Sequence, residues 1–85
     1  MMVSVLKVKI IDTTNEHVKR YIGETRTCRM LENKSIVLET PDHVIRTSPV
    51  VEITHDDLLI IETKNSVYTL EILEELKDEE VEANG

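Results

Sequence analysis

The chain has 85 residues, of which 17 are acidic and 10 are Lys or Arg, giving a formal net charge of −7. It has no Trp, no Phe, two Tyr and one Cys, so its core must be aliphatic and no intrachain disulfide can form. The charge balance argues against a basic nucleic-acid face, and no apolar run approaches the ~20 residues that span a bilayer.

Short runs of alternating apolar and polar residues, rich in Val, Ile and Thr, predict β-strands along most of the chain. The first run places Leu6, Val8 and Ile10 on one face. This N-terminal run has the pattern of a strand and not that of a signal peptide, so we expect a cytoplasmic protein. The second run, residues 16–22, alternates only weakly, and a short helix is the alternative there. The predicted strands span residues 3–11, 16–22, 25–31, 35–40, 44–53, 58–63 and 67–73.

The fold prediction starts from residues 44–73, because this stretch has the pattern of three strands joined by two tight turns. Pro49 cannot donate a ladder hydrogen bond, so Thr47-Ser48-Pro49 marks an edge, a bulge or a sharp bend. A strand that bends there can serve two sheets. Short strands with closely spaced turns indicate an all-β fold. We predict a small SH3-like barrel over residues 1–73, with an OB-like barrel as the alternative.

The C-terminal residues 74–85 hold six acids and one Lys, a net charge of −5. Like charges four residues apart, such as Glu75 and Glu79, oppose a helix. We therefore expect a frayed acidic tail, with a brief helix through Leu76 as the alternative.

Two segments in the second half of the chain carry a resemblance. The pattern Thr-Ser-x-Val-Val lies in Arg46-Thr47-Ser48-Pro49-Val50-Val51, and Thr-x-Asn-Ser-x-Tyr-x-Leu lies in Thr63-Lys64-Asn65-Ser66-Val67-Tyr68-Thr69-Leu70. Together they resemble small bacteriophage and prophage proteins of Gram-positive bacteria. Between the segments that group has a glycine turn, where this chain has His55-Asp56-Asp57. The resemblance implies an origin in a mobile element and, as for many small phage proteins, inhibition of a host protein by binding.

Groups that could carry catalysis are few. Ser48 and Thr47 lie in no nucleophile elbow, and we predict turn hydrogen bonds for them. The His-Asp-Asp turn at residues 55–57 is the best local metal cluster, but adjacent turn residues rarely converge on one ion. We therefore expect no catalytic residue, no metal and no cofactor. Cys28 is expected to be a small buried side chain rather than a reactive thiol.

Nucleic-acid recognition would need aromatic rings beside a basic groove. Tyr21 and Tyr68 could supply the rings, and Arg26, Arg29 and Arg46 could form a patch if the fold brings them together. Because the charge balance is acidic, we expect no nucleic-acid partner.

Several predicted strands are apolar on both faces, as in Leu58-Leu59-Ile60-Ile61. One face of a small barrel should meet solvent, and an exposed apolar patch normally marks a partner surface. We predict that this surface consists of Val50, Leu59, Ile61, Val67 and Leu73. Its partner would be a host protein or a second copy of the chain.

These observations favour a non-enzymatic protein–protein interaction module, phage-derived, that binds and modulates a host protein. The first alternative is an acidic nucleic-acid mimic that inhibits a nucleic-acid enzyme, with Glu52, Asp56, Asp57 and Glu62 as the phosphate-mimicking carboxylates. The second alternative is a small nucleic-acid-binding barrel.

Overall fold

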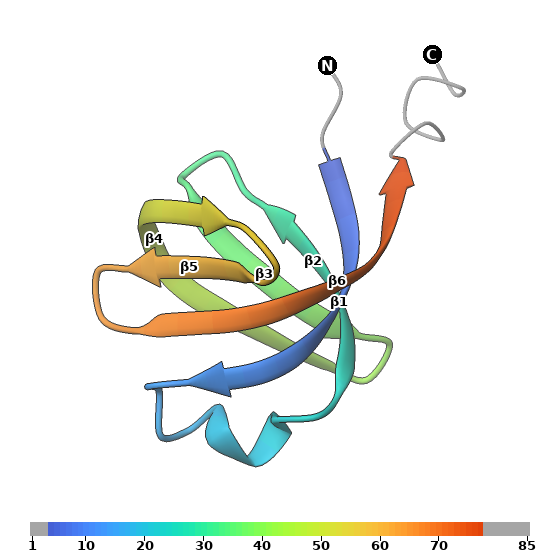
Figure 1. The fold of residues 1–85 in the computed structure, drawn as a ribbon. Helices are drawn as coiled ribbons and strands as arrows, with labels where there is room; N and C mark the ends of the chain where they lie inside the picture. The colour runs from blue at the N-terminus through green and yellow to red at the C-terminus, as the bar shows by residue number, and fades with distance from the viewer. Residues whose placement is uncertain (1–3, 78–85) are drawn as a thin grey trace.

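The structure is a computed structural model that describes residues 4–77. Six antiparallel strands follow one another in sequence order, and the last returns to pair with the first, so that the sheet closes into a barrel (Figure 1). The predicted all-β barrel is confirmed. The elements are β1 (Ser4–Thr13), η1 (Lys19–Tyr21), β2 (Thr25–Met30), β3 (Ser35–Thr40), β4 (His43–His55), β5 (Leu59–Thr63) and β6 (Val67–Lys77).

The strand predicted over residues 16–22 is wrong, because this segment forms a turn that ends in the single 3-10 turn η1. The backbone N–H groups of Val18 and Lys19 both donate to the carbonyl oxygen of Asn15. The side chain of Asn15 accepts a further bond from the N–H of His17. An Asn side chain that bonds the nearby backbone favours a turn over a strand. The observed turn is closer to the alternative prediction for this segment, a short helix.

The core is aliphatic, as the composition requires. Four side chains at its centre are less than 2% exposed, and they come from β1, β3 and β6: Val8, Ile10, Leu38 and Leu70. Burial of each such side chain stabilises the fold by about 1.5–3 kcal/mol. The inward face predicted for Leu6, Val8 and Ile10 is confirmed, with Leu6 partly buried against the cluster.

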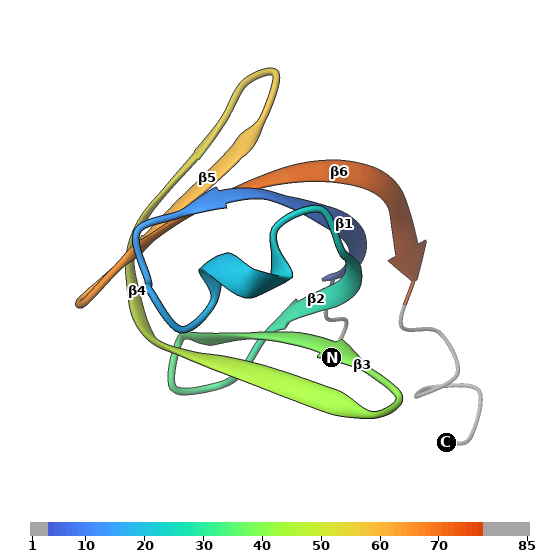
Figure 2. The same cartoon turned by 90° about the horizontal axis from the view of Figure 1, so that it is seen from below.

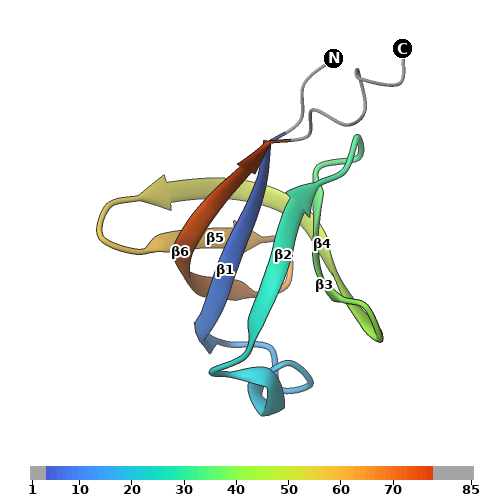
Figure 3. The ribbon, with the colours of Figure 1, turned by 90° about the vertical axis from the view of Figure 1, so that its right-hand side faces the viewer.

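Strand β4 bends in the middle and serves two neighbours. Its first half pairs with β3 as far as Pro49, and its second half pairs with β5 from Val50 onward. The bend predicted at residues 47–49 is therefore confirmed. Beyond it, β4 and β5 form a hairpin that projects from the barrel in two perpendicular views (Figures 2 and 3).

Strand β6 runs to Lys77, so the predicted tail at residue 74 begins too early. Glu74 stands opposite Lys7 of β1, and Glu71 stands opposite Lys9. Opposite charges across a strand pair stabilise it, which explains why these residues extend the sheet and do not form a helix. The remaining tail, residues 78–85, lies outside the described residues. Nowhere between residues 4 and 77 is a helix long and apolar enough to cross a membrane.

Candidate functional site

The two segments that carry the resemblance contact each other where β4 bends. The Ser48 hydroxyl donates to Thr63 Oγ1 at 2.8 Å and accepts the backbone N–H of Asn65 at 3.2 Å. Thr63 Oγ1 in turn donates to the carbonyl oxygen of Ser66 at 3.1 Å and accepts the N–H of the same residue. Thr63 is buried, so these bonds satisfy a hydroxyl that has left water.

Thr47 closes the other side of the bend. Its hydroxyl accepts the N–H of Ile36 at 2.9 Å and donates to the carbonyl oxygen of Ser48 at 2.8 Å. Both hydroxyls of the Thr-Ser pair therefore make the turn hydrogen bonds that the sequence predicted for them. These hydroxyl groups hold β3, β4 and the β5–β6 turn together, which is a structural role.

Two residues of the predicted partner surface, Leu59 and Ile61, are in the core, with 7% and 2% of their surface exposed. Their expected exposure is wrong, because β5 directs them inward and directs Ile60 and Glu62 outward. Val50 and Val67 are half-buried, and Leu73 is exposed. The structure therefore does not bring the five residues together on one outer face.

Exposed apolar side chains lie instead on both faces of the projecting β4–β5 hairpin. Val51 is 63% exposed, Ile53 46% and Ile60 40%, with Ile53 on the face of Ile61 and Ile60 on the opposite face. Four carboxylates lie on the same hairpin. We call this set the hairpin surface, and it consists of Val51, Glu52, Ile53, Asp56, Asp57, Ile60 and Glu62.

The four carboxylates suggested for phosphate mimicry all belong to the hairpin surface. Glu52 and Glu62 stand directly opposite each other on β4 and β5, and Asp56 and Asp57 lie in the turn that joins the two strands. Residues 50–63 contain no Lys and no Arg to balance them. The hairpin therefore combines a concentrated negative charge with exposed apolar groups, and the sequence did not predict that the two would coincide.

An apolar pocket of about 410 Å³ opens beside this hairpin. Its apolar walls come from Leu6 of β1, Ile53 of β4, Leu59 of β5 and Ile72 of β6. His55 of β4 and Glu75 of β6 complete the lining. Ile53 shares a face with Ile61, directly opposite it, yet is half exposed because the hairpin projects beyond the barrel. The pocket thus extends the apolar part of the hairpin surface toward the mouth of the barrel.

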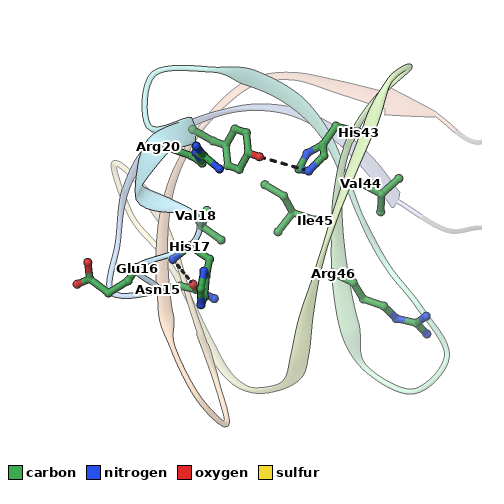
Figure 4. A pocket seen from close by; sticks show the side chains of 10 residues that line it. Asn15, Glu16, His17, Val18, Arg20, His43, Val44, Ile45 and Arg46 are labelled. Atoms are coloured by element: carbon green, nitrogen blue, oxygen red, sulfur yellow. Dashed lines mark hydrogen bonds between the residues drawn. The ribbon is translucent and has the colours of Figure 1, made fainter.

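A second pocket, of about 520 Å³, lies between η1 and the start of β4 and is mainly polar (Figure 4). Ile45 points toward η1, while Val44 and Arg46 point away from it. Tyr21 and His43 both line it, with ring centroids 4.9 Å apart. Because an arginine can only donate, His43 Nδ1 must accept the bond from Arg26 Nη1 at 3.1 Å.

The side chain of Arg26 is buried beside this pocket. Its side chain is 2% exposed and bonds to Glu24 at 2.8 Å and to the carbonyl oxygen of Leu38 at 3.2 Å. Its guanidinium also stacks on the Tyr21 ring, 4.8 Å from the centroid. Its burial was not predicted, because an arginine is normally exposed.

The basic patch considered for nucleic acid does not form. Arg26 is buried, and Arg29 is bound to Glu39 at 2.8 Å. Arg29 and Arg46 stand on either side of Val37 across β2, β3 and β4. Val37 is only 5% exposed, which fits arginine stems covering it. Tyr68 is also buried, so its ring cannot stack on a base.

Cys28 is buried, as predicted, and burial raises the pKa of its thiol to about 12. Within residues 4–77 no three His, Cys, Asp or Glu side chains group in a way that could hold a metal ion.

Comparisons of the chain with family models, with curated proteins and with solved structures found no match.

Proposed function

We propose that the protein is a non-enzymatic interaction module that binds another protein through the hairpin surface. The observation that carries the proposal is the coincidence of Val51, Ile53 and Ile60 with four carboxylates on one projecting hairpin. Exposed apolar groups that cluster on a rigid element mark interaction surfaces. A typical interface buries such anchors at its centre and surrounds them with a polar rim.

The acidic rim suits a partner with a basic surface. Unbalanced carboxylates accelerate encounter with a basic protein and discriminate against acidic ones. The apolar anchors would supply most of the affinity, because exposed charge pairs at a rim contribute little.

The proposed partner is a host protein of a Gram-positive bacterium, and the chain is proposed to be of phage origin. The resemblance of the Thr-Ser-x-Val-Val and Thr-x-Asn-Ser-x-Tyr-x-Leu segments supports both statements. Of the two barrel families considered, we favour the SH3-like one. Every strand pairs with its neighbours in sequence order, whereas the OB fold contains a Greek key.

A second candidate function is phosphate mimicry toward a nucleic-acid enzyme. It is favoured by the positions of Glu52 and Glu62, which stand opposite each other on paired strands. Binding by mimicry would weaken steeply with added salt, whereas binding through apolar anchors would change little.

The proposal is tested by affinity capture from a Gram-positive lysate with tagged wild type and two matched variants. Val51→Asp places a charge in the hairpin surface, and Val44→Asp places the same charge on an equally exposed valine of the same strand, outside it (63% and 56% exposed). We expect Val51→Asp alone to lose the captured protein. Equal retention by both variants would refute the hairpin surface as the binding site.

A chain ending at Lys77 separates the acidic tail from the barrel. It keeps all of β6, which a chain cut at Leu73 would shorten. Capture by this variant places the function on the barrel, and loss of capture moves it to residues 78–85.

A further inference from the structure

Among residues 4–77, no strand pairs with one edge of β4 beyond the bend. The pairing of β4 with β3 ends at Pro49, and the last backbone hydrogen bond on that side runs from the N–H of Val50 to the carbonyl oxygen of Lys34. From Glu52 to His55, β4 pairs with β5 on its other edge only. Closure of the barrel therefore leaves an open strand edge of about five residues, Val51–His55, along the projecting hairpin.

An open edge offers unpaired N–H and C=O groups at alternate residues, which an extended chain can bind as an added strand. Here the edge is flanked by Val51 and Ile53, the two most exposed apolar side chains of the hairpin. Backbone bonds would give the added strand its register. Glu52 and Ile53 face opposite sides of the hairpin, with Glu62 and Ile61 respectively, so they would contact successive residues of the incoming chain on its two faces.

The charge around the edge determines which extended chain it suits. Glu52 and the turn acids Asp56 and Asp57 lie along it, and residues 50–63 hold no Lys or Arg. A second copy of this chain would bring identical carboxylates together between two molecules of net charge −7. A segment with alternating basic and apolar side chains is complementary in both charge and pattern.

We propose that the β4 edge at Val51–His55 binds an extended segment of a partner protein as an added strand, and that the segment alternates apolar with Lys or Arg side chains. This inference rests on the proposed function and specifies how the hairpin surface would bind.

The probe is a seven-residue peptide in which Lys or Arg alternates with Val, titrated into the full-length protein and followed by amide NMR. We expect shift changes centred on residues 50–56, together with slower amide hydrogen exchange at alternate residues there. A control peptide with Glu at the charged positions should bind at least about tenfold more weakly.

Two N-methylated versions of the basic peptide test the backbone contact itself. One is methylated on the basic residues and the other on the valines, so that each blocks the N–H groups of a single edge while side chains and charge stay the same. Strand addition predicts that one version binds about tenfold or more weakly than the other. Equal affinities would overturn the proposal.

Three further results would also overturn it: no binding at millimolar peptide, shift changes centred on β6 beyond Leu70 or on the η1 pocket, or edge protection that rises with protein concentration alone. The last would identify a second copy as the occupant. If Val51→Asp loses the captured host protein while the peptide leaves the edge unchanged, strand addition fails and the hairpin surface stands.

Discussion

Glu52 and Glu62 stand directly opposite each other on β4 and β5, so two carboxylates share one cross-strand position. Both are exposed, and no Lys or Arg occurs in the hairpin to separate them. Like charges at such a position destabilise a strand pair. Elsewhere in the barrel, opposite charges meet, as Lys9 and Glu71 do on β1 and β6. The hairpin therefore has an unfavourable arrangement at the surface that we propose for binding.

Replacing Glu62 by Gln should stabilise the protein, because it removes this repulsion with little change of shape. We expect the free energy of unfolding in urea to rise by about 0.2–1 kcal/mol. The control is Glu32→Gln, at an exposed turn residue that is not part of any strand pair. The gain should shrink at high salt. A gain of equal size in the control would contradict the repulsion.

Arg26→Met should destabilise the protein by about 1.5–3 kcal/mol, the range for buried hydrogen bonds to a charged group. The change removes the bonds to Glu24, to the Leu38 carbonyl and to His43. Arg29→Met is the matched control, because its bond to Glu39 is exposed and should be worth about 0.2–1 kcal/mol. Urea unfolding of both variants measures the difference. Equal losses would show that Arg26 contributes no more than a surface ion pair.

The hydroxyl pair Ser48 and Thr63 should show coupling in a double-mutant cycle. Ser48→Ala and Thr63→Val each leave former partners unpaired, and we expect each to cost about 1–3 kcal/mol. Because they share one hydrogen bond of 2.8 Å, the double variant should lose less than the sum of the two. Strict additivity in urea unfolding would show that the bond is not formed in solution.

The strands were predictable from alternation, but the faces of several residues were not. Counting by twos from the buried Ile45 places Val51 on the inner face, yet Val51 is 63% exposed. It is the extra residue of a β-bulge between the pairs Val50–Thr63 and Glu52–Glu62. An earlier register shift on β4 lies between the pairs Val37–Arg46 and Ser35–Pro49. Each extra residue reverses the alternation, so Val51 leaves the inner face after the first shift and Ile53, opposite Ile61, returns to it after the second. The position of each extra residue depends on the partner strand. Leu73 is exposed at a second bulge, between Ile72 and Glu74.

The burial of Leu59 and Ile61 shows a different limit of prediction from sequence. In a run of four apolar residues both alternations fit equally well, so the sequence carries no signal for the inward face. The choice is made by register, which sets Leu59 opposite Leu70 and Ile61 opposite Tyr68, two core residues of β6. The prediction therefore assigned Leu59 and Ile61 to the wrong face of β5.

Cys28 should resist alkylation in the native protein, because burial raises the pKa of its thiol to about 12 from a normal value of 9.0. At pH 8 the buried thiol is ionised about a thousandfold less than an exposed one, and only the thiolate reacts. The chain has no other Cys, so mass spectrometry after iodoacetamide treatment reports this site alone. We expect slow modification of the folded protein and fast modification in urea. The destabilised Arg26→Met variant should react faster than wild type, because it opens more often. Modification of the native wild type at the rate seen in urea would contradict the buried position of Cys28.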